Sequence, residues 1–299
     1  MKIIDIHTHA QDILFLPGDA THVRPGPGFL IPLTGRNGFK WYGPREGTLD
    51  TLLHHIFRRR LAKETLARNA MATVDGLKEA MREFDIARSV ILPVEPYGTT
   101  VELLSLIKDQ NSLVPFASVD PHDPGRIDKL TRYMKAGCRG LKLHPIIQKF
   151  EPTCRECFEI LEEYSQYELP VIFHCGRHSY YLRPTGAEEN ADPRNYVKLF
   201  SAFPGMRFIL AHSGMFQCLT TIDIAERFEN VYLETSFQPT DILHRAIKKV
   251  GADRVVYGSD WPFGGPSFMV PIVLELTDGN PDLRERLLWK NAERLIGEA

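Results

Sequence analysis

The chain has 299 residues, a net charge of −2, and an ordinary balance of 43% hydrophobic and 25% charged residues. This length suits one large α/β domain or two ordinary ones. The small net charge gives no electrostatic reason to expect nucleic acid as a partner, and no apolar run approaches the roughly 20 residues of a membrane span. The sequence starts with a strand-like run instead of a secretion signal, and its five cysteines fit a reducing compartment, so we expect a cytoplasmic protein.

Short apolar runs alternate with amphipathic segments along the whole sequence. Their continuous apolar character is typical of parallel strands that are covered on both faces. Eight strands are predicted, near 2–7, 88–94, 114–119, 139–144, 170–175, 207–212, 230–235 and 254–258. Helices are predicted between them, including 73–84, 125–136, 154–167 and 241–250. Eight β-α units favour an α/β fold of the (β/α)₈ TIM barrel type, and we interpret residues 1–299 as a single domain.

A long insertion at residues 11–70 follows the first strand and distorts the predicted barrel. It begins as a loop rich in glycine and proline and becomes helical near 49–70. A loop of this length on the active-site side either contributes to function or covers hydrophobic surface. The candidates to line or close a site are Phe39, Trp41, Tyr42 and Arg45.

Histidines and one aspartate stand where predicted strands end. His7 and His9 point to the same side because alternate strand residues share a face. His174, His212 and Asp260 end later apolar runs in the same way. Catalytic groups of barrels lie at the C-terminal ends of the strands, so we expect these five residues to meet there. Three imidazole nitrogens (His7, His9, His174) and one carboxylate oxygen (Asp260) suit a divalent ion. We expect zinc, with manganese as the alternative, and one or two ions.

Several motifs together resemble the amidohydrolase superfamily, most closely its amidohydrolase-related branch, also called amidohydrolase-2. They are Asp5-Ile6-His7-Thr8-His9, Gly140-Leu141-Lys142-Leu143-His144-Pro145, His174, His212-Ser213-Gly214 and Gly258-Ser259-Asp260-Trp261-Pro262. The resemblance runs nearly end to end, but it is not specific to a substrate. It implies a distorted (β/α)₈ barrel with a metal at the C-terminal mouth. The branch contains hydrolases of C–N and C–O bonds and also non-oxidative decarboxylases of aromatic or unsaturated acids.

Roles follow from this chemistry. Asp260 is expected to hold the metal, accept a proton from the bound water and pass it to the leaving group. His212 either ligates a second metal, orients the water or polarises the substrate carbonyl. Strand parity puts Lys142 and His144 on the inner face; in superfamily members similar at this strand, the lysine is carbamylated and bridges two metals, whereas in others nothing there touches metal. Asp5 either orients a ligand histidine or is a buried group that is hydrogen-bonded for structure.

Other polar and aromatic residues are candidates for the substrate or for redox chemistry. Arg177, His178 and Arg183 follow His174 closely, and a guanidinium pairs well with a carboxylate, so we expect a small substrate that carries one. His144 and Trp261 are further candidates for substrate contacts at the mouth. The Cys-x-x-Cys of Cys154 and Cys157 is either a redox pair or two partly buried thiols.

Three functions are compatible with these motifs. The leading interpretation is a metal-dependent hydrolase of an amide, lactone or cyclic ester. The alternative is a metal-dependent non-oxidative decarboxylase on the same scaffold. The third is a metal-binding barrel without catalytic activity. A homo-oligomer is compatible with each of them.

Overall fold

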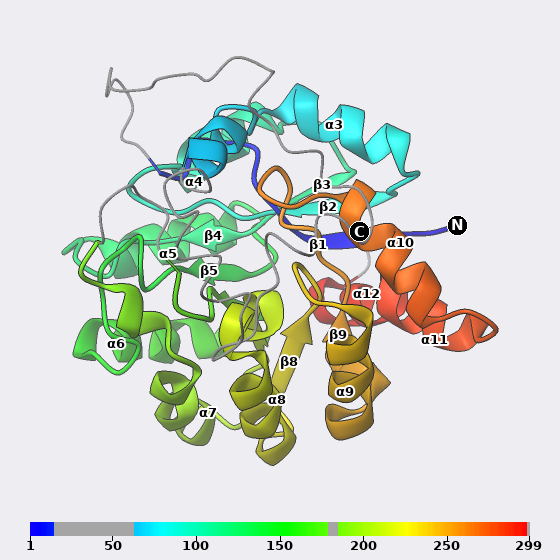
Figure 1. Cartoon of the computed structure of the whole chain (residues 1–299). Coiled ribbons are helices and arrows are strands. Elements are labelled where there is room, and N and C mark those ends of the chain that lie inside the picture. Colours follow the sequence, from blue (N-terminus) through cyan, green and yellow to red (C-terminus); the bar gives the residue numbers. More distant parts are fainter. Residues whose placement is uncertain (15–62, 179–184, 298–299) are drawn as a thin grey trace.

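The computed structural model describes residues 1–14, 63–178 and 185–297 (Figure 1). In these ranges parallel strands alternate with helices, and most of the helices lie on the outside of the strands (Figure 1). The predicted α/β class is therefore confirmed. No helix in the described ranges is long and apolar enough to cross a membrane.

Most of the insertion predicted at 11–70 lies outside the described residues. Its C-terminal end is described, and residues 63–69 are helical, in agreement with the helix predicted near 49–70. Five residues that the sequence singled out as site candidates fall outside the described ranges: Phe39, Trp41, Tyr42, Arg45 and Arg183.

The strands are short and almost wholly buried, and every predicted strand is found. They pair in parallel in chain order, as a three-stranded sheet β1-β2-β3 and a six-stranded sheet from β4 to β9. Phe116 alone separates β3 from β4, so these two correspond to the single strand predicted near 114–119. The bounds are β1 Ile4–Thr8, β2 Arg88–Ile91, β3 Leu113–Pro115, β4 Ala117–Ser118, β5 Leu141–Leu143, β6 Val171–Phe173, β7 Phe208–Leu210, β8 Val231–Glu234 and β9 Val255–Val256.

Hydrogen bonds connect the last strand with the first. The backbone N–H of Ile6 donates to the carbonyl of Tyr257 at 3.1 Å, and that of His9 donates to the carbonyl of Trp261 at 2.8 Å. These bonds bring the two ends of the strand series together, as the TIM barrel interpretation requires. They also place the residues after β9 directly beside the end of β1.

Several helices are amphipathic, among them α3, α5, α6 and α9, and several begin at capping side chains. Thr73 accepts the N–H of Gly76 at the start of α3, which satisfies a donor that has no partner within the helix. The helices predicted at 73–84, 125–136, 154–167 and 241–250 correspond to α3, α5, α6 with the 3₁₀ turn that follows it, and α9. The α-helices are α3 Val74–Glu83, α4 Thr100–Leu106, α5 Arg126–Lys135, α6 Arg155–Tyr164, α7 Val197–Ala202, α8 Cys218–Arg227, α9 Thr240–Val250, α10 Pro266–Leu276, α11 Pro281–Glu285 and α12 Asn291–Ile296. Short 3₁₀ segments occupy Ser165–Tyr167, Glu188–Ala191, Pro193–Tyr196 and Ala252–Arg254, a turn with irregular backbone occupies Ala211–Gln217, and a π turn occupies Arg286–Lys290.

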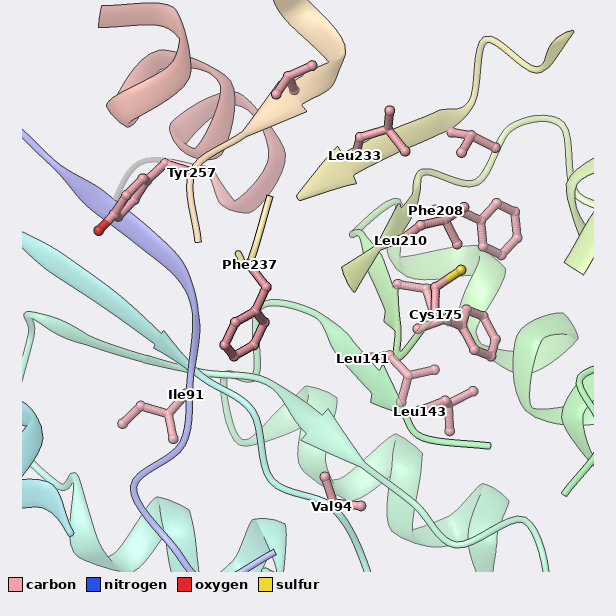
Figure 2. Packing of buried hydrophobic residues seen from close by; sticks show 14 of the residues in the cluster. Ile91, Val94, Leu141, Leu143, Cys175, Phe208, Leu210, Leu233, Phe237 and Tyr257 are labelled. Carbon is pink, nitrogen blue, oxygen red and sulfur yellow. The ribbon is translucent and has the colours of Figure 1, made fainter. Parts of the chain in front are cut away.

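The largest apolar cluster lies between strands and helices. Leu141 and Leu143 of β5 belong to it together with Phe208 and Leu210 of β7 (Figure 2). Burying each such side chain contributes about 1.5–3 kcal/mol to folding. Lys142 lies between the two leucines in sequence and interacts electrostatically with residues of the candidate site, which agrees with the predicted parity of this strand.

Cys154 and Cys157 form a helix cap. The Sγ of Cys154 accepts the N–H of Cys157 at the start of α6, at 3.4 Å. Burial raises the pKa of both thiols, which opposes the thiolate form that redox chemistry needs. The structure therefore favours the interpretation of two partly buried thiols.

Candidate metal centre

Three buried side chains from the two ends of the strand series meet at one point. His7 Nε2 and His9 Nε2 each lie 3.2 Å from Oδ1 of Asp260. His7 and His9 come from the end of β1, and Asp260 follows β9 in the segment that is hydrogen-bonded to β1. Each of these three residues is at most 6% exposed. Residues that lie more than 250 positions apart in sequence thus form a compact set of two imidazoles and one carboxylate.

The second ring nitrogen of each histidine is already engaged. Nδ1 of His9 lies 2.7 Å from the carbonyl oxygen of Leu92, and Nδ1 of His7 lies 3.0 Å from Oε2 of Glu234. A carbonyl can only accept, so a neutral His9 carries its proton on Nδ1 and turns the Nε2 lone pair toward Asp260. Burial lowers the pKa of His7, so the His7 ring stays neutral.

This arrangement fits a divalent ion. Two nitrogen lone pairs and a carboxylate oxygen converge, and they repel one another unless a cation or a proton lies among them. Imidazole nitrogen and carboxylate oxygen are the ligands that zinc and manganese take in enzymes. A hydrogen bond from the other ring nitrogen to a carbonyl or carboxylate is typical of metal-binding histidines. The side chains of His7, His9 and Asp260 would hold the ion.

His174, the fourth predicted ligand, lies one imidazole ring away from this group. Its Nδ1 lies 3.2 Å from Nε2 of His212, and its Nε2 lies 3.1 Å from the carbonyl of Gly176. The ring of His212 in turn lies 4.9 Å from that of His7, centroid to centroid. Both ring nitrogens of His174 therefore contact other protein groups, and its role as a ligand stays a prediction.

His144 packs flat against His174. Their ring centroids are 4.1 Å apart and the planes differ by 6°. Burial lowers the pKa of both rings, so two neutral imidazoles can stack without charge repulsion. The structure thus brings the predicted His144 to the site through His174.

The segment that carries His212 has an unusual backbone. His212, Ser213 and Met215 are non-glycine residues with positive φ (57°, 44° and 50°). Gly214, between them, packs so tightly that an added Cβ would lie 1.9 Å from Oγ1 of Thr221. Such conformations cost of order 1–3 kcal/mol each and persist where the surrounding structure enforces them. Asp260 also has positive φ (55°), so strain accompanies two candidate site residues.

Lys142 is buried inside the barrel. Burial lowers the pKa of its ammonium to about 8, and the negative charges of Asp260 and Glu234 oppose this shift. Within the part of the chain that the structure describes, no hydrogen bond or ion pair is found for its Nζ. A buried ammonium of this kind is a site for an anion or for covalent modification.

The carboxylate that contacts the ring of His7 is Glu234 and not Asp5. Asp5 was one candidate for this role, but its Oδ1 accepts the backbone N–H groups of His7 and Ser259, and among the described residues no ring nitrogen contacts it. The carboxylate that contacts the His7 ring is Glu234, which sequence reasoning missed. It ends a predicted apolar strand, as His174 and His212 do, and that position was the available signal.

The predicted substrate residues are placed as follows. The guanidinium of Arg177 lies 3.0 Å from Oε1 of Glu189 and 3.8 Å from Oδ2 of Asp192. The ring of His178 lies 6.1 Å from that of Phe216, and Trp261 is 8% exposed beside the end of β1. Arg177 thus already has two carboxylate neighbours, and its contact with a substrate stays a prediction.

Comparison with known proteins gives one family and one fold. A family model described as Amidohydrolase matches residues 4–297. No curated protein matches the sequence. Among solved structures, an uncharacterised TIM-barrel protein from Bordetella bronchiseptica is similar, with 17% identity, a TM-score of 0.69, and coverage of 99% of this chain and 98% of that one.

Two further similar structures are those of a decarboxylase and of a probable hydrolase. A dihydroxybenzoic acid decarboxylase from Polaromonas, with bound manganese and the inhibitor 2-nitroresorcinol, is 17% identical at a TM-score of 0.62, covering 86% of this chain and 95% of that one. A probable 2-pyrone-4,6-dicarboxylic acid hydrolase from Acinetobacter baumannii, with bound citric acid, is 13% identical at a TM-score of 0.59, covering both chains fully. At these identities the similarity shows the TIM-barrel fold.

Proposed function

This chain belongs to the amidohydrolase family, and from that premise we propose that it is a metal-dependent hydrolase of a small molecule. Its substrate would be an amide, a lactone or a cyclic ester that carries a carboxylate. The observation that carries the proposal is the position of Asp260, whose Oδ1 lies 3.2 Å from the Nε2 atoms of both His7 and His9. A buried carboxylate beside two imidazoles can hold a cation and accept a proton at the same place. The proposal takes residues 1–299 as one domain.

A divalent ion bound here would supply hydroxide near neutral pH and polarise the substrate's reacting group. Asp260 accepts the proton of the attacking water and later delivers it to the leaving nitrogen or oxygen. Burial raises the pKa of Asp260 above its ordinary value, which makes the carboxylate a better base. His212 lies next to the His7 ring and orients the water or the substrate carbonyl. His174 completes the ligand set in this proposal.

A carboxylate-bearing substrate is supported by the cationic groups around the site and by the neighbours. Lys142 is buried near Asp260, and Arg177, His178 and Arg183 follow His174 in sequence. Like the Acinetobacter hydrolase with its citric acid, this chain would bind an acid. His144 and Trp261 would contact the rest of the substrate. Since all five cysteines are free thiols, we also propose a cytoplasmic location.

The second candidate is a metal-dependent non-oxidative decarboxylase. The fold similarity to the Polaromonas decarboxylase with its manganese supports it. The same residues would act, with a carboxylate as the reacting group and a proton delivered to carbon. Manganese is then the native ion, whereas zinc is our choice for the hydrolase. A metal-binding barrel without turnover is the third candidate.

In this proposal the number of metal ions depends on whether the amine of Lys142 is carbamylated. If its amine were carbamylated, the new carboxylate would be a ligand for two metals, and His212 would ligate the second one. If it stays an ammonium, it binds the substrate's carboxylate and one ion is present. Mass spectrometry of the native protein distinguishes these states, because a carbamate adds the mass of carbon dioxide.

The test combines metal content with a substrate panel. Protein purified without chelator is assayed by elemental analysis and then with amides, lactones, cyclic esters and aromatic acids, with carbon dioxide measured in each reaction. Hydrolysis without carbon dioxide supports the proposal. Release of carbon dioxide from an acid supports the decarboxylase. Protein that is fully loaded with metal but inactive on the whole panel contradicts both.

A further inference from the structure

Glu234 contacts two histidines of the site at once. It is the last residue of β8 and is fully buried. Its Oε2 lies 3.0 Å from Nδ1 of His7 and accepts the backbone N–H of His212 at 2.9 Å. Ser236 donates its hydroxyl to the same oxygen at 2.7 Å and its backbone N–H to the other oxygen. One carboxylate thus collects donors from the ends of β1, β7 and β8.

The contact with His7 determines which ring nitrogen can bind a cation. When Nδ1 donates to Glu234, the lone pair of a neutral His7 is on Nε2, which is the atom beside Asp260. Loss of the carboxylate would leave the ring free to rotate and to exchange tautomers. Partners of this kind typically change metal affinity by 10–100-fold.

Glu234 reaches the ring of His212 through the hydroxyl of Ser236. Nδ1 of His212 lies 2.7 Å from Oγ of Ser236, whose hydroxyl donates to Glu234. The backbone of His212 is also fixed by Glu234. A single carboxylate therefore sets both the backbone position of His212 and, through one hydroxyl, its ring.

Glu234 packs directly against the backbone of Gly258. A Cβ added to Gly258 would lie 2.4 Å from Oε1 of Glu234 and 2.7 Å from its Cδ. Gly258 follows β9 in the segment that ends in Asp260, so the close approach joins β8 to the strand end that carries the catalytic carboxylate. The absence of a side chain at 258 thus has a physical reason, which is space for Glu234.

We propose that Glu234 is a positioning residue that couples the ligand His7 to His212. This inference rests on the proposed function for the identity of the site, but it concerns contacts of the chain itself. Its two branches can be separated. The His7 branch controls metal affinity, and the Ser236 branch controls how well His212 acts on the substrate.

The experiment compares metal affinity, measured for Mn²⁺ and Zn²⁺ by competition with a chelator, in four variants and the wild type. Glu234→Ala should weaken binding by about 10–100-fold, and Glu234→Gln by less, because an amide oxygen still accepts from His7. Ser236→Ala should stay within about threefold of wild type in affinity and lose mainly kcat, by about tenfold. Glu95→Gln is the matched control, since Glu95 is a buried carboxylate that accepts from Thr100 and Tyr133 and should leave affinity unchanged.

A second measurement does not depend on metal binding or on activity. In the metal-free wild type, the ¹⁵N signals of the His7 imidazole should show a protonated Nδ1, whereas Glu234→Ala should show a mixture of tautomers. Wild-type affinity and an unchanged His7 tautomer in Glu234→Ala would overturn the positioning role while leaving the proposed function intact. A second ion that is lost with Glu234 would make it a ligand instead and would equally overturn the proposal. Wild type without metal affinity would refute the proposed function alone, and the tautomer would still decide the role of Glu234.

Discussion

The two sides of the candidate site differ in what their polar groups already contact. On one side, His7 and His9 have one nitrogen fixed by a carboxylate or a carbonyl, and the other is directed at Asp260. On the other side, His144, His174 and Arg177 contact rings, carbonyls and carboxylates of the protein itself. The first side is preorganised for a cation, whereas the second must exchange contacts before it can bind a ligand. Strand ends that are linked by backbone hydrogen bonds hold the first side, and a loop after β6 carries part of the second.

The largest effect is expected from removing the preorganised side. Replacing His7 and His9 together with alanine should abolish stoichiometric metal binding, because two of the converging donors disappear. Elemental analysis after gel filtration measures this, with circular dichroism to confirm the fold. His144→Ala serves as the control on the opposite side and should keep its metal. Full occupancy in the double variant would place the metal elsewhere.

Asp260→Asn should separate binding from chemistry on the preorganised side. The amide oxygen can still contact a cation, but it cannot accept a proton at the operating pH, so we expect much of the metal to remain. Turnover should fall by about 10²–10⁴-fold, the usual contribution of a general base. Steady-state kinetics on metal-loaded protein gives the answer. A variant with nearly wild-type kcat would exclude Asp260 as the proton acceptor.

The other side is tested through Arg177. If the guanidinium leaves Glu189 and Asp192 to bind a substrate carboxylate, Arg177→Ala should lower kcat/KM by up to about tenfold for an acid and hardly at all for its methyl ester. If it stays paired, both substrates should respond alike. Stability should barely change, because partly exposed ion pairs contribute about 0–1 kcal/mol. The ratio of acid to ester kcat/KM in wild type and variant decides between the two.

The smallest effect concerns the stability of the metal-free protein at acid pH. Burial lowers the pKa of His144, so the folded state keeps it neutral while the unfolded state takes up a proton below about pH 6.5. Below this pH the unfolded state binds more protons than the folded state. The free energy of unfolding therefore decreases as the pH is lowered, by about 1.4 kcal/mol per pH unit for each such histidine. His144→Asn should therefore reduce the loss of stability between pH 6.5 and 5.5 by about 1 kcal/mol. Urea unfolding at the two pH values tests this, and an unchanged slope would show that His144 titrates normally.

Much of the fold and half of the site could be derived from the sequence. Continuous apolar runs predicted all eight barrel strands, because strands covered on both faces need apolar residues at nearly every position. His7, His9 and Asp260 could be grouped because alternation and the strand-end rule for barrels act locally. These arguments need only the order of residues and a general property of the fold.

Only the tertiary structure determines which partners the polar groups of the site contact, because these partners come from segments far apart in sequence. The ring of His7 is oriented by Glu234, which lies 227 positions away, while the nearby Asp5 turns to backbone N–H groups. Arg177 contacts the carboxylates of Glu189 and Asp192, two residues that its place after His174 in the sequence did not indicate. Local patterns specify which face a side chain takes, but the partner on that face is set by the closure of the barrel. Hydrogen-bond partners of buried polar groups are therefore the part of the site that sequence reasoning could not supply.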